Sequence, residues 1–378
     1  MKPATALIAF DLTRQAADVA QATAVAWLVA AGTGSVLAVA GVWTVNLLPW
    51  LGLPLFGDLA DRLPRRRLVW AAQLAVLAAA VATTVLTARG GLPVGLAFAW
   101  TAVYATLTAL ARPATKGLIR EVASEAAALV ARLTALEYVV LGAGQFLAAA
   151  VLVSGSPSLA FAVMALLLAL GLLALARTGT AEPATEPAPP WRPVLAQLAA
   201  PRFRSLFLLT VLCGTFAFTL RVLAPLLVLR DLGGGVLAFA ALGAAYSLGA
   251  AAGAAWRHGR PAAGWLVAAA AVLAAGTTGS LPLAIAAFGA IGVASGHQDA
   301  ANSALVAAEL PPGAQSRGMA VASLIWRVPG LLAGVVAGLS GYAGLGALSV
   351  ALAAAMLLTG SAASASARWG WGTAPPPR

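Results

Sequence analysis

The fold is decided by one short charged segment between two long apolar stretches, which reads Gly57-Asp58-Leu59-Ala60-Asp61-Arg62-Leu63-Pro64-Arg65-Arg66-Arg67. Gly57 lacks a Cβ atom and lets a neighbouring backbone approach closely at a helix end, and Pro64 favours a tight turn. Asp61 is placed to meet a basic group or the positively polarised N-terminus of another helix. The arginines hold the segment at the anionic inner leaflet of a membrane. We therefore interpret residues 57–67 as a cytoplasmic connection between two membrane spans.

The composition around this segment is that of a membrane protein. Hydrophobic residues make up 61% of the 378 positions and charged residues only 9%, whereas a soluble domain carries about 25% charged residues. A span requires about 20 residues and a short connection, so the chain accommodates about twelve spans and no sizeable soluble domain. The net charge of +11 would also suit a nucleic-acid-binding protein. The basic residues lie mainly in short connections, however, so we expect no nucleic-acid partner.

The predicted spans fall into two groups of six, separated by a Pro-rich stretch at 177–190 that cannot span and is interpreted as a linker. Their ranges are 6–31, 36–56, 68–88, 94–115, 127–153, 158–176, 203–229, 236–256, 262–279, 282–308, 318–340 and 343–361. The predicted fold class is an all-α membrane protein. Its expected parts are an N-terminal six-helix bundle at 1–176, a cytoplasmic linker at 177–200, a C-terminal six-helix bundle at 201–361 and a cytoplasmic tail at 362–378.

The basic residues are distributed unequally between the two sides of this layout. If the N-terminus is inside, the outer connections hold only Arg89 and Arg230. The inner side holds Lys2, Arg62, Arg65, Arg66, Arg67, Arg112, Lys116, Arg120, Arg177, Arg192, Arg202, Arg204, Arg257, Arg260, Arg317, Arg368 and Arg378. Positive charge is retained on the cytoplasmic side of membrane proteins. We therefore predict a multi-pass protein of the cell inner (plasma) membrane with both termini in the cytoplasm.

With these spans in place, the segment at 57–67 resembles the signature of the major facilitator superfamily, Gly-x-Leu-Ala-Asp-Arg-x-Gly-Arg-Arg-x between the second and third helices. The matching residues are Gly57, Leu59, Ala60, Asp61, Arg62, Arg65 and Arg66, and the departure is Pro64, where glycine is commonest. The resemblance implies two pseudo-symmetric bundles that rock around a midplane site. It also implies an inner gate, in which Asp61 ties the second helix to the fourth or to the start of the eleventh. The gate and motif residues are Gly57, Asp61, Arg62, Arg65, Arg66 and Arg112.

Further segments are similar to the macrolide and siderophore efflux branch, the enterobactin-exporter-like members of that superfamily. They are Asp18-Val19-Ala20 with Gly32-Thr33-Gly34-Ser35, the segment 112–119 that begins Arg112-Pro113-Ala114, and Leu310-Pro311 with Arg317-Gly318. Thr115 stands where this branch usually has arginine. The counterpart of the motif in the second half, residues 256–261, keeps basic residues and lacks the acid. The antiporter signature expected in the fifth span is absent from residues 138–147.

Ionisable side chains inside the spans are candidates for function, because each costs about 2.5–3.5 kcal/mol at the centre of a membrane. The first span carries Asp11, Arg14 and Asp18 on one helical face. We expect Asp11 to be solvated near the inner surface and Arg14 to pair with Asp18 across one turn. Asp18 is the first candidate for a carboxylate that titrates during transport. The alternative is a static Asp18–Arg14 pair.

The other proton-coupling candidates are Glu137, Asp299 and His297. Glu137 is expected either to line a cavity or to pair with Arg132. His297 would titrate near neutral pH or serve as a hydrogen-bonded packing residue, so Asp299 is preferred, with Arg327 as its expected partner. The substrate-cavity candidates are Arg14, Arg221, Asn302, Arg327, Trp27, Trp43, Trp100, Tyr104, Phe216 and Trp326. Glycines such as Gly243, Gly249 and Gly253 are expected to allow close helix packing.

No P-loop, zinc-ligand cluster or nucleophile elbow occurs in the sequence. We therefore expect neither an enzyme nor a metal or cofactor site, and an ion gradient as the driving force. The resemblance implies a monomeric secondary transporter that exports a hydrophobic or amphipathic small molecule against proton entry, with membrane lipids around it. Alternatives are uptake, export of a lipid or siderophore by the same fold, and a non-transporting membrane scaffold.

Overall fold

The computed structural model describes residues 3–89, 91–122, 126–178, 191–256, 261–309, 312–340 and 345–366. These residues form fourteen α-helices and one short 3-10 helix, η1. Their bounds are α1 Pro3–Thr33, α2 Val36–Leu47, η1 Leu48–Gly52, α3 Leu53–Arg62, α4 Arg65–Ala88, α5 Val94–Val122, α6 Ala126–Leu152, α7 Pro157–Ala176, α8 Trp191–Leu198, α9 Pro201–Arg230, α10 Val236–Ala255, α11 Pro261–Thr277, α12 Leu281–Glu309, α13 Pro312–Ser340 and α14 Leu345–Ser366.

The helices lie where the apolar stretches predicted them, and several extend beyond those stretches. The second predicted span is built from α2, η1 and α3, because Pro49 and Pro54 interrupt the regular helical hydrogen bonding. The segment at 57–67 was predicted as a connecting loop. It is instead mostly helical: α3 ends at Arg62, α4 begins at Arg65, and only two residues join them. A short helix, α8, also occupies part of the predicted linker.

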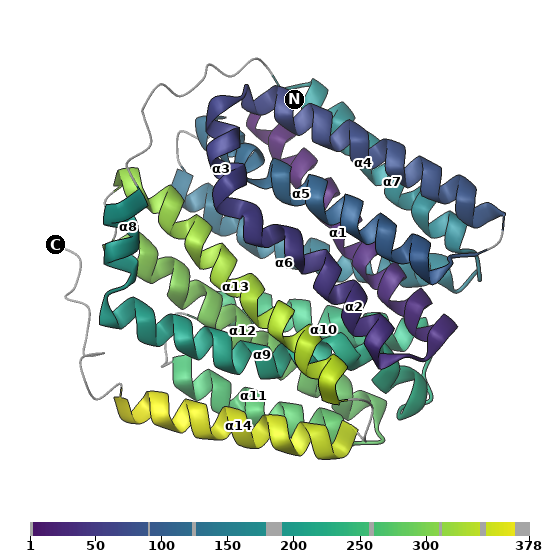
Figure 1. The fold of residues 1–378 in the computed structure, drawn as a ribbon, viewed down its shortest axis with the longest axis vertical. Coiled ribbons are helices and arrows are strands. Elements are labelled where there is room, and N and C mark those ends of the chain that lie inside the picture. The colour runs from purple at the N-terminus through teal and green to yellow at the C-terminus, as the bar shows by residue number, and fades with distance from the viewer. Residues whose placement is uncertain are drawn as a thin grey trace.

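Short polar residues fix the connections at the opposite end of the bundle. Gly34 adopts φ = 60°, a conformation that favours glycine, and the Ser35 hydroxyl accepts a hydrogen bond from the Ala38 N–H at 3.2 Å to cap α2. We call this end, where α1 passes into α2, the far end. The end at which α3 passes into α4 is called the motif end, and the N-terminus lies there (Figure 1). These turns set the antiparallel course of neighbouring helices.

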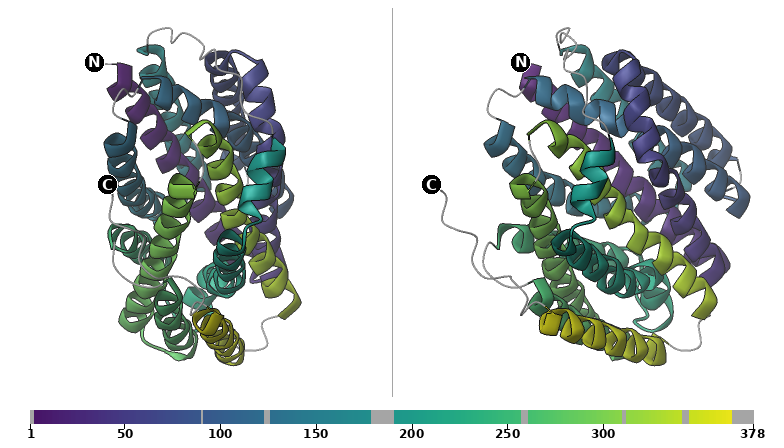
Figure 2. Two further views of the ribbon diagram at one scale, coloured as in Figure 1. Left: turned by 90° about the vertical axis from the view of Figure 1, so that its left-hand side faces the viewer. Right: turned by 60° about the vertical axis from the view of Figure 1, so that its left-hand side comes forward.

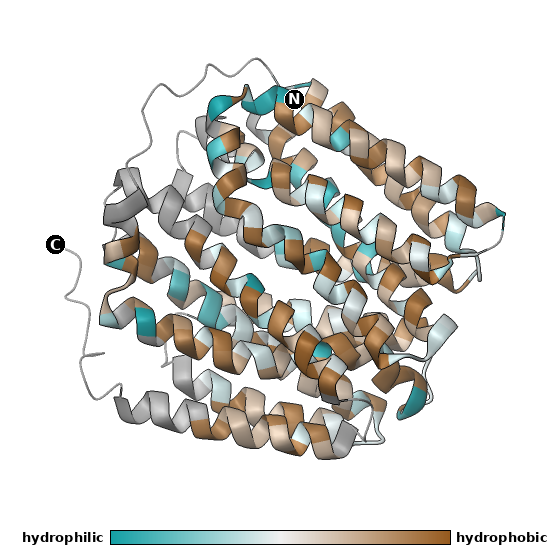
Figure 3. Ribbon diagram, in the orientation of Figure 1, coloured by the Kyte–Doolittle hydropathy of each residue, from teal (hydrophilic) through white to brown (hydrophobic). Residues whose placement is uncertain are grey.

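The chain folds into two helical bundles, which we call the N-half (α1–α7) and the C-half (α9–α14). Figures 1 and 2 show the long helices running in roughly the same direction, with the N-half and C-half side by side. Seven helices of the described residues are long and apolar enough to span a membrane, and four shorter apolar helices accompany them. Apolar residues cover most of the helix lengths (Figure 3). The protein is therefore an all-helical, multi-pass membrane protein.

Two glycine-rich contacts join the halves. On α13, Gly330, Gly334 and Gly338 face Leu47, Thr44 and Leu37 of α2, respectively. A Cβ atom on Gly330 would come within 2.5 Å of the Leu47 side chain. On the other side of the molecule α6 packs on α10, where Gly142 faces Ala244 and Gly243 faces the side chain of Gln145. Small residues at these positions allow the helices of opposite halves to approach closely.

The closest helix pair lies within the C-half, between α10 and α12. Cβ atoms placed on Gly249 and Gly253 of α10 would fall within 3.0 Å of the backbone of α12, and those on Gly292 and Gly296 of α12 within 3.0 Å of the backbone of α10. The two main chains are thus in direct contact. The prediction that Gly243, Gly249 and Gly253 permit close helix packing is confirmed: Gly243 lies in the contact with α6, and Gly249 and Gly253 lie in the contact with α12.

Candidate functional site

The charged residues of α1 form a buried cluster whose pairing differs from the predicted one. Arg14 Nη2 donates to Asp11 Oδ1 at 2.9 Å, and Gln15 Nε2 donates to Asp11 Oδ2 at 3.1 Å. Arg112 of α5 lies 3.5 Å from the same carboxylate. The expectation of an Arg14–Asp18 pair is therefore wrong. So is that of a solvated Asp11, which is 0% exposed.

The reason for this difference is a contact between helices: Arg112 lies within α5 and faces Asp11 of α1 from there. Asp18 lies one turn deeper and is half-buried. It makes no hydrogen bond or ion pair with any residue that the structure describes. It interacts electrostatically with Arg14 and with Arg327 of the C-half.

A side-chain hydrogen bond crosses between the halves near the middle of the bundle. The Tyr138 hydroxyl on α6 donates to Asp299 Oδ2 on α12 at 3.2 Å. Arg327 of α13 also reaches the N-half, where its guanidinium lies 4.0 Å from the ring centre of Trp50 in η1. The expected Asp299–Arg327 ion pair does not form, because each residue has a partner on the opposite half. Glu137 is half-buried beside Tyr138, and the side chain of its alternative partner Arg132 lies outside the described residues.

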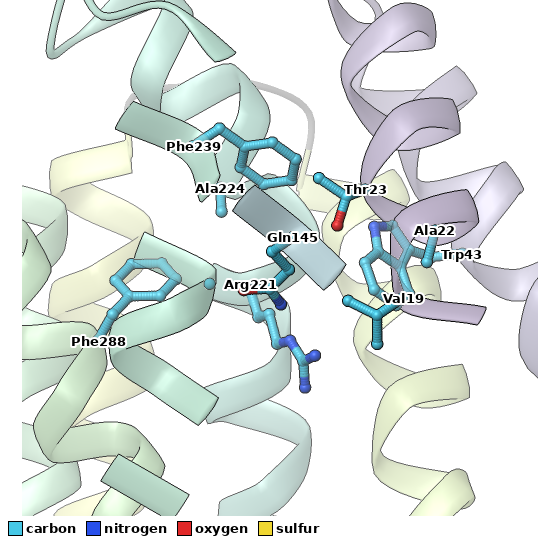
Figure 4. A pocket seen from close by; sticks show the side chains of 10 residues that line it. Val19, Ala22, Thr23, Trp43, Gln145, Arg221, Ala224, Phe239 and Phe288 are labelled. Carbon is cyan, nitrogen blue, oxygen red and sulfur yellow. The ribbon is translucent and has the colours of Figure 1, made fainter. Parts of the chain in front are cut away.

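A cavity of about 50 Å³ lies between the halves, toward the far end (Figure 4). It is lined by Val19, Ala22, Thr23, Trp43, Gln145, Arg221, Ala224, Phe239, Gly243 and Phe288. The Arg221 guanidinium is 4.3 Å from the ring centre of Tyr246, 5.4 Å from that of Phe218 and 5.9 Å from that of Trp43. Arg221 and Trp43 were predicted as cavity residues, and the structure brings them together here.

Several polar atoms at this cavity have no hydrogen-bond partner among the described residues. They are Trp43 Nε1 and Gln145 Oε1, together with Gln21 Oε1 at an adjoining cavity of about 10 Å³ that Trp43 also lines. Unpaired buried polar groups are rare and are often completed by a ligand or by water. Thr23, Gln145 and Gln21 were not predicted as site residues. The signal that would have found them is a polar side chain within an apolar span.

The remaining cavity candidates lie elsewhere. Asn302 donates to Thr210 Oγ1 at 3.1 Å, in a buried network with Gln298 and Trp265 inside the C-half. His297 Nδ1 lies 3.0 Å from the Trp256 carbonyl oxygen at the end of α10. Both positions are those of packing residues.

The predicted aromatic residues are divided among three places. Trp100 packs between Tyr104 and Phe161 within the N-half, with ring centres 5.4 Å apart in each pair. Trp27 stacks on Phe239 of the C-half at 5.8 Å, close to the cavity. Phe216 and Trp326 are half-buried on α9 and α13. Trp27 thus joins the two halves through a ring contact, as Trp43 does through the guanidinium of Arg221.

The motif residues occupy the ends of α3 and α4. None of the described atoms lies within 4 Å of a Cβ atom placed on Gly57, so the predicted close approach of a backbone there is wrong in this conformation. The Arg65 side chain packs against Gly117 of α5, at 3.1 Å from such an atom on that glycine. Arg62 is exposed and Arg66 is half-buried. The side chain of Asp61 lies outside the described residues, and Arg112 contacts Asp11 as given above.

The far end is closed by a contact between the halves. Arg230, at the end of α9, donates a hydrogen bond to the Gly34 carbonyl oxygen in the connection between α1 and α2. Trp27 and Phe239 stack below it.

Comparison with known proteins identifies the fold of the chain. No family model and no curated protein sequence matches the chain. Among solved structures, it is similar to the nucleoside transporter NupG, with a TM-score of 0.71 at 13% identity over 98% of this chain and 100% of that one. A bacterial homologue of the human lysosomal transporter Spinster, inward-facing and occupied, matches with a TM-score of 0.71 at 18% identity over 99% and 98% of the two chains. An auto-inhibited peptide transporter of the POT family matches with a TM-score of 0.72 at 13% identity over 100% and 99%. The chain has the fold of major facilitator transporters along its full length.

Proposed function

We propose that the chain is a secondary transporter that exports a hydrophobic or amphipathic small molecule by alternating access, driven by proton entry. The similar solved structures are transporters of small molecules by their titles. The observation that carries the proposal is the bond from Tyr138 to Asp299, because it places a titratable carboxylate across the two halves, between the motif end and the lined cavity.

The contacts between the halves suit a rocking motion. The α2–α13 and α6–α10 surfaces are built on glycine and small side chains, which offer few interlocking groups. Alternating access requires that such surfaces part at one end of the molecule and close at the other. In this conformation the far end is closed by Arg230 and Gly34.

The charge distribution orients the protein in the membrane. We propose that the motif end, which carries Arg62, Arg65, Arg66 and Arg67, is cytoplasmic, with both chain termini on that side of the plasma membrane. The closed far end is then the outer side, and the cavity is reached from the cytoplasm. A monomer suffices, because the two halves of one chain enclose the cavity. Asp61 and Arg62 remain the proposed inner latch, while Arg112 is engaged with Asp11.

Proton binding to Asp299 has a direct consequence for the contact between the halves. While the carboxylate is ionised, the Tyr138 hydroxyl makes a charge-assisted hydrogen bond to it, and such bonds are about twice as strong as neutral ones. Protonation removes that assistance and favours separation of α6 from α12 at this level. A proton taken up by Asp299 therefore biases the equilibrium between the two conformations.

Asp299→Asn is expected to abolish substrate-dependent proton movement, because the amide can still accept from the Tyr138 hydroxyl but cannot take up the proton. The measurement uses proteoliposomes with an imposed pH gradient and an internal pH-sensitive dye. The substrates are matched carboxylates, amides and ammonium compounds built on a naphthyl and on a decyl group.

Tyr138→Phe is the matched control, since it removes the donor and keeps the titratable group. It should retain proton coupling at a changed rate. Unaltered proton movement in Asp299→Asn would contradict the assignment and transfer the coupling role to Asp18 or Glu137, each tested by the corresponding amide substitution. Absence of proton-linked transport for every compound would contradict the proposed function.

A further inference from the structure

Arg221 is the charged residue that lines the cavity. Among the described residues, its guanidinium contacts aromatic rings and not an acidic side chain. Its guanidinium is 4.3 Å from the ring centre of Tyr246, and no carboxylate of the described residues lies within 4.0 Å of it. Cation–π contacts stabilise a cation by about 0.5–2 kcal/mol. This is less than the free energy needed to place a cation near the centre of a span. The positive charge of Arg221 is thus only partly compensated by the protein.

The acids nearest the middle of the bundle are engaged elsewhere. Asp11 binds Arg14 and Arg112, and Asp299 accepts from Tyr138. Asp18 interacts electrostatically with Arg14 and Arg327. Compensation of Arg221 by Asp11 or Asp299 would require breaking a contact that the structure holds, and Asp18 lies more than 4.0 Å from the guanidinium.

The hydrogen-bond donors of Arg221 are also available. The N–H groups of the guanidinium donate no hydrogen bond to the residues that the structure describes, so they remain for an acceptor. A planar fork of this kind matches a carboxylate or another oxyanion with two parallel hydrogen bonds. The unpartnered indole N–H of Trp43 lines the same space and is a second donor. Figure 4 shows Arg221 and Gln145 between Trp43 and the rings of Phe239 and Phe288.

The size of the cavity fits a head group and not a whole substrate. A volume of about 50 Å³ holds a few water molecules, since one requires about 10–15 Å³ on this measure. Apart from Thr23, the other lining side chains are apolar, including Val19, Ala22 and Phe288, and would receive the adjoining part of a ring or chain. Separation of the halves at the motif end would provide room for the remainder.

We propose that this cavity binds the acidic group of the transported molecule, so that the substrate class is an amphipathic organic anion whose carboxylate or other oxyanion pairs with Arg221. The proposal rests on the proposed transport function and names its substrate class. Trp43 adds a hydrogen bond from its indole N–H to the same group, and the rings of Phe239 and Phe288 contact its apolar part.

The test measures binding to the purified full-length protein in detergent by quenching of tryptophan fluorescence, without any gradient. The probes are the naphthyl and decyl carboxylates with their matched amides and ammonium compounds. The carboxylates are expected to bind at least about tenfold more tightly than the amides, since one charge-assisted contact contributes about 1.5–3 kcal/mol. Arg221→Gln should abolish this preference, and Arg221→Lys should retain part of it.

Arg89→Gln is the control, because Arg89 is exposed and distant in sequence from every cavity residue. The proposal is overturned if amides or ammonium compounds bind the wild-type protein as tightly as carboxylates, if no probe binds, or if the preference survives in Arg221→Gln. The wild-type comparison remains decisive even if that variant does not fold. Transport of neutral or cationic probes with proton movement would refute this inference alone, whereas carboxylate binding without any transport would refute the proposed function alone.

Discussion

Gly253→Ala is expected to prevent stable folding of the C-half. A Cβ atom at this position would fall within 3.0 Å of the Val293 carbonyl and the His297 amide on α12. Both are main-chain groups, so no side-chain rotation relieves the clash and α10 must move away from α12. Overpacking costs about 1–3 kcal/mol and occasionally more, and the rigid neighbour places this case at or above the upper limit. The measurement is the yield of monodisperse protein and its unfolding temperature in detergent.

Gly95→Ala provides the matched control. No atom of the residues that the structure describes lies within 4 Å of a Cβ atom at Gly95, and alanine is favoured over glycine in a helix by about 0.5–1 kcal/mol. This variant should fold as well as the wild-type protein or slightly better. If Gly253→Ala unfolds at the wild-type temperature, the direct contact between the α10 and α12 backbones is not present in the protein.

Asp11→Asn is expected to destabilise the N-half by about 3–5 kcal/mol, the range found when one partner of a buried ion pair is removed. The reason is that Asp11 binds Arg14 and also lies near Arg112, and Arg14 is only 4% exposed. The substitution leaves a buried guanidinium without its counter-charge. The measurement is thermal or denaturant unfolding of the purified protein in detergent.

The double variant Asp11→Asn with Arg14→Gln separates charge from packing. Removing both charges should restore much of the stability, because neutral hydrogen-bonding side chains replace the ion pair. The cycle of single and double variants gives the interaction energy of the pair. Equal stability of Asp11→Asn and the wild-type protein would show that Arg14 has another counter-charge.

The positions of the membrane helices could be predicted from the sequence because apolar runs of about 20 residues have few other interpretations. The residues at which these helices begin and end were harder to predict. The helices α3, α5 and α13 continue through charged residues at 57–62, 116–122 and 312–317, respectively. Hydropathy marks where lipid ends, whereas backbone hydrogen bonding extends the helix into the interface. The segment at 57–67 was accordingly interpreted as a loop although nearly all of it is helical.

The pairing of charges could not be predicted from spacing alone. Asp11 and Asp18 lie three and four residues from Arg14, and both spacings place a carboxylate on the same helical face. The choice is made by Arg112, which reaches Asp11 from another helix. In the same way, Tyr138 meets Asp299 across 161 positions of sequence, a contact that no local pattern encodes.

The four glycines between α10 and α12 also couple the movements of these two helices within the C-half. Because the two main chains touch, we expect α10 and α12 to move together as one rigid body. In this pair, α10 carries Gly243, which lines the cavity, and Tyr246, which contacts Arg221, while α12 carries Asp299. If a molecule bound in the cavity displaces α10, we therefore expect α12 to move with it and to change the distance between Tyr138 and Asp299 directly, without rearrangement of the side chains between them.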